Sequence, residues 1–548
     1  MSTDDVYDCI VLGLGAHGSS AVYHMTQNTS SAPRRVLGIE QFPAAPHTFG
    51  SSHGRSRIIR TAYFEKEEYV PLLQSSLQLF KDLESQRLAR EGPNTEPLLT
   101  LCGGLMIGRP EGVVVAGTQR SCRAHGLSHS VLSPADVKAL YGGVFNLSDG
   151  EVAVREDDAG YLVPEKCISE YLRLAEEGGA SLVFGERVVN WEVVEDTASS
   201  STAGLFVVKT ESGKTFRART GVMAVGAWAP ELYNDDIKDL APLRVERRAL
   251  HWFEPVGDSL AEFAKIPVYI WDSGKTSSFY GFPFQPGAPV GGVKVAIHGV
   301  DTSDGSFACT PSTVRRDVDD SETEQLRALL KDRMPLLNGR RVETATCMYT
   351  CTENDHFIID PPPTYQNVLL VSPCSGHGFK FSSVVGKICR EVLFEGGSKL
   401  DIGLFSLKSH AAQRNARRGE AVTAPPPAPA STSVAASSYV VLEEQQLAKA
   451  VPDESNGSKC KLLEVSYNVS EVFKIPLGID LNDKEQVVDF HVKYNTLYIN
   501  LKGVEDTLEI TCEGYLQGYD YKRPKEGSAV LRSGEDYNME DSEWVKNS

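Results

Sequence analysis

The sequence predicts an α/β protein that continues, after a linker, into a β-rich C-terminal domain. Three observations support this prediction. Residues 7–41 have the pattern of a strand, a helix and a second strand around a glycine-rich turn. Helical and strand patterns then follow one another to about residue 410. Beyond it lie a run of Pro, Ala and Ser and a segment with the period-two alternation of β-strands.

The composition is that of a globular protein with an acidic excess. At 548 residues the chain can bury more than one core, and 41% of its residues are hydrophobic. The formal net charge of −18 argues against nucleic acid or an anionic membrane as partner, because both require a basic face. No secretory signal and no membrane-spanning apolar run are apparent. The 11 cysteines form no CxxC pairs, which indicates reduced thiols.

Residues 7–41 are predicted to form a dinucleotide-binding unit of the Rossmann type. The first strand is expected at Asp8–Leu12, the helix at 16–27 and the second strand at Arg35–Glu40. The first turn carries a Gly-x-Gly-x-x-Gly motif in the required context, with a strand before it and a helix after it. The motif indicates a bound dinucleotide but does not distinguish NAD from FAD.

Each glycine of the motif has a separate task. Gly13 permits the tight turn, Gly15 lets the backbone approach a pyrophosphate, and Gly18 allows close packing of helix on strand. The pyrophosphate would rest on the helix N-terminus, where free N–H groups favour negative charge. Glu40 ends the second strand, 22 residues after Gly18, near the spacing expected for a residue that accepts bonds from ribose hydroxyls.

The rest of the body mixes both kinds of element. Helices are expected at Tyr69–Ser85, Glu165–Gly178, Ser321–Met334 and Ser382–Leu393. Strands are expected at Gly221–Val225, Val293–His298 and Val368–Ser372. Positions 294 and 298 would lie on one face of their strand, because side chains alternate with period two.

Residues 411–438 are predicted to be a linker and residues 439–548 a separate acidic domain. The run 421–438 contains only Ala, Pro, Ser, Thr and Val, which is typical of an extended linker. Strand-like alternation follows at 461–475, 486–494, 496–502 and 507–513. The domain holds 12 Lys and Arg against 21 Asp and Glu, so its net charge of −9 is half of the chain's −18. Its role is open, a protein partner being one expectation, and residues 534–548 are expected to be disordered.

A series of longer motifs points to a family. They lie, in order, at Pro46–Tyr63, Glu68–Leu72, Tyr280–Pro283, Lys294–His298, Cys347–Thr350, Asp355–Asp360 and Ser375–Phe381. Together they resemble the sarcosine oxidase and pipecolate oxidase group of FAD-dependent amine oxidases, over roughly residues 6–408. The linker and the C-terminal domain lie outside this resemblance.

The resemblance implies a fold in two parts and a reaction. An FAD-binding part would comprise about 1–90, 150–230 and 335–410, and an antiparallel-sheet substrate part about 91–149 and 231–334. FAD would take a hydride from a secondary amino acid such as sarcosine or L-pipecolate, the imine would hydrolyse, and O₂ would be reduced to hydrogen peroxide. Two alternatives stay open: a dehydrogenase with another electron acceptor and a non-catalytic flavoprotein scaffold.

The resemblance also assigns roles around the flavin. Cys347 matches the cysteine bonded to the 8α-carbon of FAD, although an arbitrary cysteine is more often a buried structural thiol. Arg60 and Lys380 match the pair that holds the substrate carboxylate, a task suited to a guanidinium fork and an ammonium charge. Arg57 matches an arginine close to the flavin face.

Four further residues are expected near the reacting atoms. Lys294 matches a lysine that contacts the flavin N5 region through water and promotes the reaction with O₂, because its charge stabilises negative charge developing there. His298 is expected beside the substrate, with a satisfied core histidine as the alternative. Tyr280 and Tyr349 are expected as pocket walls or, alternatively, as packing residues.

The remaining expected contacts with the cofactor come from backbone segments. Gly376 and Gly378 would present N–H groups to the flavin pyrimidine ring. Val188 matches a segment at the adenine end, and Gly226 belongs to a second dinucleotide motif. Cys374 departs from the family pattern, in which an aromatic residue often precedes the serine, so the pocket is expected to differ in shape. No metal site is predicted.

The sequence does not identify the preferred amine or the oligomeric state, and it leaves the compartment open. The chain ends in Lys-Asn-Ser and lacks the peroxisomal signal Ser-Lys-Leu, which favours the cytoplasm. The resemblance favours the peroxisome, where peroxide can be destroyed.

Overall fold

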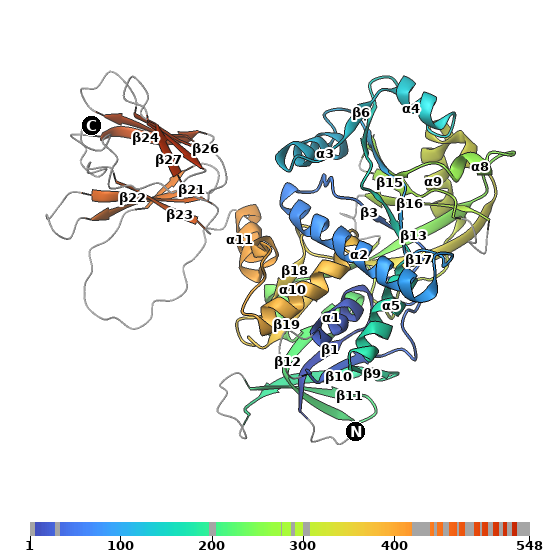
Figure 1. The fold of residues 1–548 in the computed structure, drawn as a ribbon, viewed down its shortest axis with the longest axis horizontal. Helices are drawn as coiled ribbons and strands as arrows, with labels where there is room; N and C mark the ends of the chain where they lie inside the picture. The colour runs from blue at the N-terminus through green and yellow to red at the C-terminus, as the bar shows by residue number, and fades with distance from the viewer. Residues whose placement is uncertain are drawn as a thin grey trace. The chain divides into compact units, whose positions relative to one another are not determined.

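The computed structural model describes residues 6–27, 33–196, 204–275, 277–285, 291–299 and 307–418, together with β-strands between Tyr439 and Ser533. The chain divides into two units, Met1–Thr423 and Ala424–Ser548, and each is described by itself. Figure 1 shows that the first unit contains two large sheets, with helices against the one that carries β1 and β12. The predicted linker from residue 419 onward and the final residues 534–548 lie outside the described residues.

The first sheet has eight strands and a parallel centre. Its path runs through β10 (Val188–Val194), β11 (Leu205–Thr210), β12 (Thr215–Met223), β1 (Val6–Leu12), β2 (Val36–Glu40) and β9 (Ser181–Phe184). In addition β19 (Val368–Ser372) pairs with β12, and β18 (Ile358–Asp360) pairs with β19. The neighbours from β12 to β9 are parallel, and helix α1 (Ala16–Thr26) connects β1 to β2, which confirms the predicted Rossmann-type unit.

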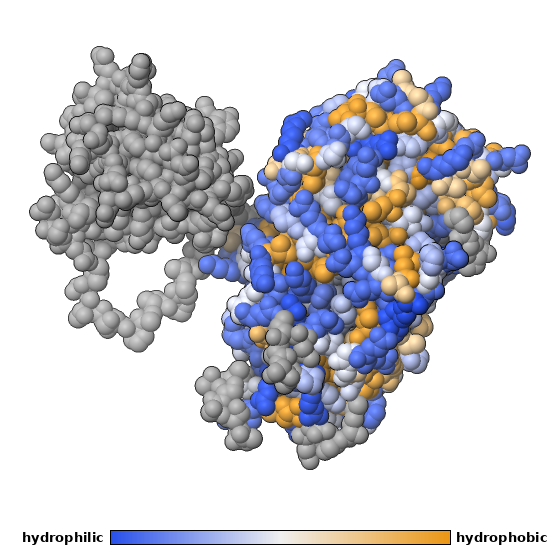
Figure 2. Space-filling model, viewed as in Figure 1, coloured by the Kyte–Doolittle hydropathy of each residue, from blue (hydrophilic) through white to orange (hydrophobic). Residues whose placement is uncertain are grey.

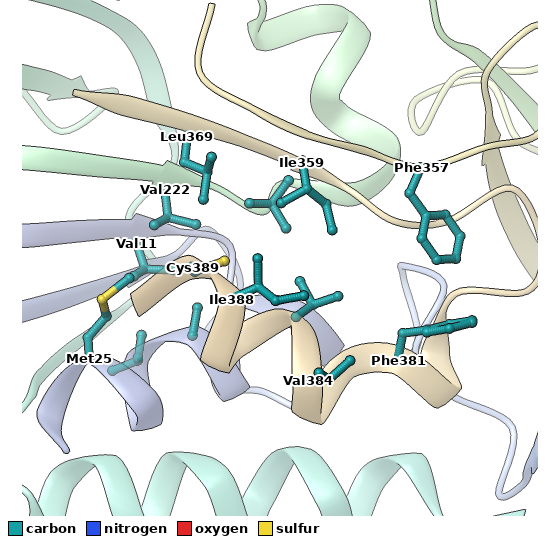
Figure 3. Close-up of a cluster of buried hydrophobic side chains, with 14 of the residues drawn as sticks. Val11, Met25, Val222, Phe357, Ile359, Leu369, Phe381, Val384, Ile388 and Cys389 are labelled. Atoms are coloured by element: carbon teal, nitrogen blue, oxygen red, sulfur yellow. The ribbon is translucent and has the colours of Figure 1, made fainter. Parts of the chain in front are cut away.

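The central strands β1, β2 and β19 of this sheet are buried on both faces, as parallel strands usually are. In β1, Cys9 and Val11 belong to the core on one face, and Ile10 and Leu12 belong to the core on the other. Figure 3 shows the first core, in which Val11 and its neighbours in the sheet pack on α1 and on α10 (Ser382–Phe394). The glycine turn after β1 is therefore held between two buried layers.

The second sheet also has eight strands. Its order is β17 (Arg341–Cys351), β13 (Arg244–Phe253), β16 (Val293–Gly299), β15 (Ser277–Gly281), β14 (Val268–Lys275), β5 (Gly104–Gly108), β7 (Val152–Glu156) and β6 (Ser130–Leu132). All neighbours are antiparallel except β14 and β5. This agrees with the expected antiparallel sheet.

Two strands of this sheet lie outside the segments predicted for it. β7 falls in the segment 150–230 and β17 in the segment 335–410, both assigned above to the FAD-binding part. Apolar alternation predicts a strand but does not say which sheet it joins, since pairing depends on the partner's pattern and register. As a consequence, Cys347 approaches the cavity described below from the second sheet.

A third, small sheet and the helices complete the first unit. The sheet has the order β3 (Arg57–Ile59), β8 (Gly160–Leu162) and β4 (Leu99–Leu101). The longer helices are α2 (Val70–Glu91), α3 (Val113–Ala124), α4 (Pro134–Tyr141), α5 (Pro164–Glu177), α9 (Asp320–Arg333) and α11 (Leu407–Arg418). The short ones are α6 (Ala229–Leu232), α7 (Asp235–Leu240), α8 (Leu260–Phe263), and the 3₁₀ turns η1 (Glu67–Tyr69), η2 (Gly226–Trp228), η3 (Pro335–Leu337), η4 (Phe379–Phe381) and η5 (Gly403–Phe405).

Local capping explains where the predicted helices agree with the structure and where they differ. α9 begins at a capping box in which Asp319 and Glu322 each bond the other's backbone N–H. α2 extends past the predicted end at Ser85 and stops before Gly92, whose φ of +96° breaks the helix. α11 runs past residue 410, so the predicted linker begins inside a helix.

The second unit consists of strands in two sheets. One contains β20 (Tyr439–Leu442), β21 (Gln446–Pro452), β22 (Cys460–Tyr467) and β23 (Glu471–Pro476). The other contains β24 (Val487–Lys493), β25 (Thr496–Leu501), β26 (Leu508–Glu513), β28 (Ala529–Ser533) and β27 (Tyr519–Lys522).

In the first unit, apolar side chains on the face drawn in Figure 2 are interspersed with polar ones. No helix among the described residues is long and apolar enough to cross a membrane.

Candidate active site

One cavity, of about 360 Å³, is lined by residues of both large sheets. The first sheet contributes the turn after β1 and the ends of β2 and β12, and the second contributes residues of β15, β16 and β17. All of the predicted site residues line this cavity except Gly18 and Lys294. A cavity of this size with apolar walls and a few polar groups is typical of a small-molecule site.

The glycine turn fits the predicted dinucleotide. A Cβ on Gly18 would lie 1.7 Å from Gly13 O, and one on Gly13, whose φ is +81°, would lie 2.7 Å from Ala224 O. These two glycines are therefore required by packing. A Cβ on Gly15 would meet only Ser52 Oγ, at 3.6 Å, so this glycine is open toward the cavity. Gly15, at the N-cap of α1, has no side chain to cap the helix, and the first turn holds no acidic residue. Ala16 N–H donates to Ser52 Oγ at 3.3 Å, and this helix end otherwise suits an anion.

Glu40 is buried beside this turn. Its Oε2 accepts a hydrogen bond from Leu14 N–H at 2.9 Å, and its Oε1 accepts one from Phe42 N–H at 3.1 Å. Burial raises the pKa of the Glu40 carboxyl, and the backbone N–H groups oppose this effect. The remaining lone pairs can accept bonds from ribose hydroxyls, as expected.

Cys347 and Arg57 meet in the wall of the cavity. Cys347 is 3% exposed, and its Sγ lies 3.8 Å from Nη2 of Arg57. The guanidinium is fixed by bonds to the carbonyls of Ser51, at 2.7 Å, and Ser56, at 2.8 Å. The thiol of Cys347 therefore lies beside a fixed positive charge in the cavity wall.

Two buried cations lie in another part of the wall. Arg60 is 1% exposed, and its Nη2 donates to both carboxylate oxygens of Glu65, at 2.8 and 2.6 Å. Lys380 Nζ donates to His377 O at 2.7 Å. Burial, and next the charge of Arg60, lower the pKa of Lys380 to about 7, while Glu65 opposes them. The Arg60 and Lys380 charges are thus placed for a carboxylate ligand.

An aromatic and imidazole wall faces the same cavity. His298 Nδ1 lies 3.2 Å from the hydroxyl of Tyr349, and its ring is 6.1 Å from that of Tyr280 in an edge-on arrangement. Burial lowers the pKa of His298 to about 4, and burial raises the pKa of both tyrosines. At neutral pH this wall is therefore uncharged.

Lys294 lies behind the wall and does not line the cavity, as the described residues define it. Its Nζ donates to Gly54 O at 2.6 Å and to Ser56 O at 2.9 Å. Burial first, and Arg57 next, lower its pKa well below the usual value. The resemblance implies a lysine that contacts the flavin through water, whereas the structure places Lys294 behind the residues that line the cavity.

The turn before α10 lines the cavity. Gly376 has φ +78°, and a Cβ there would lie 2.4 Å from Cε2 of Tyr349, while one on Gly378 would lie 1.5 Å from Pro373 O. Both glycines are thus required for the turn. Cys374 also lines the cavity, and its Sγ accepts a bond from Thr350 N–H at 3.2 Å.

Val188 and Gly226 line the cavity as predicted, at the start of β10 and of η2. Glu65 and His17 also line the cavity, although neither was predicted as a site residue. His17 Nε2 lies 3.3 Å from Gly378 O and so connects the two glycine turns. Glu65 lies five positions after Arg60, the arginine predicted to bind a carboxylate. This short spacing could have indicated that Glu65 is a partner of Arg60. No cluster of potential metal ligands occurs among the described residues.

The chain is similar to known proteins over most of its first unit. Residues 8–392 match the family model of FAD dependent oxidoreductases. The chain is 38% identical over 411 residues to monomeric sarcosine oxidase of Streptomyces avermitilis, covering 74% of this chain and 98% of that protein. It is 30% identical over 402 residues to N-methyl-L-tryptophan oxidase of Yersinia pestis, covering 73% and 98%. The structure of NikD, an unusual amino acid oxidase, superposes with a TM-score of 0.59 at 22% identity, covering 73% of this chain and 97% of that one, which shows a shared fold.

Proposed function

The chain belongs to the family of FAD dependent oxidoreductases, and on this premise we propose that it oxidises N-methyl and other secondary amino acids in the manner of sarcosine oxidases. When bound, FAD accepts a hydride from the C–H bond next to the nitrogen and passes the electrons to O₂, giving an imine and hydrogen peroxide. The observation that carries the proposal is one cavity that joins a dinucleotide turn to the buried cations Arg60 and Lys380.

In this proposal the cofactor and the substrate contact different parts of the cavity wall. FAD is held by the Gly13–Gly18 turn, Glu40, Val188, Gly226 and the turn Gly376–Gly378. The substrate carboxylate binds Arg60 and Lys380, which fixes the amino acid in one orientation. The uncharged His298, with Tyr280 and Tyr349, then faces the amine without repelling it.

The substrates proposed are secondary amino acids with one carboxylate, such as sarcosine and L-pipecolate. Ile58 and Ile270, which are 9% and 8% exposed, line the cavity and pack with Tyr280 in one apolar cluster. Such a wall suits a methyl group or a ring on the nitrogen. Peroxide production under air, compared with activity toward an artificial electron acceptor, separates an oxidase from a dehydrogenase.

A covalent bond between Cys347 and FAD is part of the proposal. Cys347 lines the cavity from β17, and the Arg57 guanidinium lies beside its sulfur. The sulfur would bond to the 8α-carbon as the thiol loses its proton and that carbon a hydrogen, and the two electrons released would reduce the flavin, which O₂ would then reoxidise. The reaction with O₂ is proposed to depend on the positive charge of Lys294, acting from behind the wall.

The C-terminal unit is proposed to be a separate module that binds a protein partner. Every residue that lines the cavity lies between Leu12 and Lys380, within the first unit. Removal of residues 424–548 is therefore expected to leave FAD binding and amine oxidation unchanged, and loss of FAD from the shortened protein would contradict this independence.

A further inference from the structure

The turn Gly54–Ser56, which leads into β3, is conformationally strained. Gly54 has φ +96°, which suits glycine, but Arg55 has φ +67°, a left-handed conformation that other residues adopt rarely. Such a conformation persists only where surrounding contacts impose it. Because Arg57 begins β3 directly after this turn, the turn decides where its guanidinium lies.

A carboxylate and an ammonium group impose this conformation. Glu165 Oε1 accepts hydrogen bonds from the N–H groups of Gly54, at 2.8 Å, and Arg55, at 3.1 Å. Lys294 Nζ donates to the carbonyls of Gly54 and Ser56. Two N–H groups of the turn are thus held from the first turn of α5 and two of its carbonyls from β16, while Ser56 N–H donates to Gly54 O within the turn.

The carboxylate and the ammonium group also act on one another through their charges. Lys294 is 3% exposed, and the charge of Glu165 opposes the lowering of its pKa by burial and by Arg57. The Oε2 atom of Glu165 is buried and has no hydrogen-bond partner in the described part of the chain, so its charge is only partly neutralised by the turn. The other groups that face Lys294 are Cys347, Arg55, Phe282, Trp252 and His53, whose pKa is lowered to about 3 by burial first and then by the charges of Arg57 and Lys294.

We propose that Glu165 is a positioning residue, which fixes the Gly54–Ser56 turn and keeps Lys294 charged for the reaction with O₂. The inference rests on the proposed oxidase function. A glutamine at position 165 would retain an oxygen acceptor for the two N–H groups but would lack the charge. The geometric and electrostatic parts of the role can therefore be separated.

The experiment compares Glu165→Gln and Glu165→Ala with Glu176→Gln, an exposed glutamate near the other end of α5. Each holoenzyme is reduced with sarcosine, or with the best substrate of an amine panel, in the absence of air and is then mixed with O₂ at several pH values. In parallel, the visible absorption of the bound flavin is titrated with pH in the absence of substrate.

Glu165→Gln is expected to slow the reaction with O₂ about tenfold near neutral pH, less than the loss of a direct electrostatic donor would. The pH above which this reaction slows is expected to move downward, because Lys294 then loses its proton more readily, and the spectral titration is expected to move in the same direction. Reduction by substrate is expected to change by less than about twofold, and Glu176→Gln is expected to match the wild type.

Identical pH profiles and spectral titrations for Glu165→Gln and the wild type would overturn the proposal, as would an equal effect of Glu176→Gln. If Glu165→Ala does not fold, Glu165→Gln decides, because it retains the contacts with the turn. A wild-type protein that does not react with O₂ would refute the oxidase function instead, and the spectral titration would then decide on Glu165 alone.

Discussion

Nη2 of Arg60 donates to both carboxylate oxygens of Glu65, at 2.8 and 2.6 Å, and this ion pair lies in the wall of the cavity. With Lys380 nearby, the site therefore carries about one net positive charge when Lys380 is protonated, which matches one substrate carboxylate. A dicarboxylate would bring a second negative charge close to Glu65, and burial makes such repulsion costly.

Replacing Arg60 by Met is expected to raise KM for the amino acid by about 30- to 1000-fold, because loss of one partner of a buried charge pair costs about 2–4 kcal/mol. The turnover number is expected to fall less, since Arg60 does not contact the C–H bond that breaks. Steady-state kinetics give both values. The matched variant Arg60→Met with Glu65→Gln removes the unpaired carboxylate and is expected to recover part of the loss. An unchanged KM would exclude Arg60 from the carboxylate site.

Binding of a carboxylate is expected to weaken as pH rises through about 7. The pKa of Lys380 is lowered to about 7 by burial and by Arg60, so the side chain is charged below this pH and neutral above it. A bound anion favours the charged form, and affinity is therefore higher at low pH. Titration with acetate, which cannot be oxidised, measures this through the flavin spectrum. The Lys380→Met protein is expected to bind acetate weakly, with an affinity that does not change as pH passes through about 7. If the affinity of Lys380→Met still changes with pH in this range, the titrating group is another residue.

Two glycine variants separate folding from cofactor binding. In Gly15→Ala the new Cβ meets only Ser52 Oγ at 3.6 Å, and the backbone at φ −70° tolerates alanine, so the protein is expected to fold but to bind FAD poorly. In Gly18→Ala the Cβ would lie 1.7 Å from Gly13 O, so the protein is expected to lose stability. Thermal unfolding and FAD content measure the two effects. Full FAD occupancy in Gly15→Ala would show that the pyrophosphate does not approach this turn.

The link between Cys347 and FAD is tested by Cys347→Ser. Acid precipitation of the wild-type protein is expected to give a yellow pellet, because the flavin stays attached. The Cys347→Ser protein is expected to bind FAD through the glycine turn and Glu40 but to release it on precipitation. Cys351→Ser, in the same strand, serves as a control that should retain the link. A colourless wild-type pellet would exclude covalent attachment.

Much of the first sheet could be predicted because its signals are local. The strand, glycine turn and helix at 6–26 are contiguous, and each glycine has a steric reason that the sequence pattern already contains. The membership of β7 and β17 in the second sheet could not be predicted, since it depends on partners far away in the sequence. The end of α2 at Gly92 was missed because the apolar pattern weakens before the helix stops.

The site was predictable where one residue type has one chemical task. Arg60, Lys380 and Cys347 line the cavity as expected. Lys294 lies behind the residues that line the cavity and bonds to the backbone of the turn Gly54–Ser56. No local sequence pattern shows whether a lysine on a strand reaches a cavity or ends at a backbone turn. Arg55 has a left-handed backbone and donates to Glu343 at 2.9 Å, and no local sequence pattern indicates either feature. Glu165 was expected only as part of a helix, because its partners Gly54 and Arg55 lie 111 and 110 residues away.

The central claim is most directly tested by adding secondary amino acids to the purified protein without air and then admitting O₂. The panel contains sarcosine, L-pipecolate, L-proline and N-methyl-L-tryptophan, with Arg60→Met as the matched control. We expect that at least one of these amino acids bleaches the flavin absorption, that O₂ restores it, and that peroxide forms in an amount equal to the amine oxidised. The proposed oxidase function would be contradicted if no secondary amino acid bleached the flavin. It would also be contradicted if the reduced flavin were reoxidised by an artificial acceptor but not by O₂.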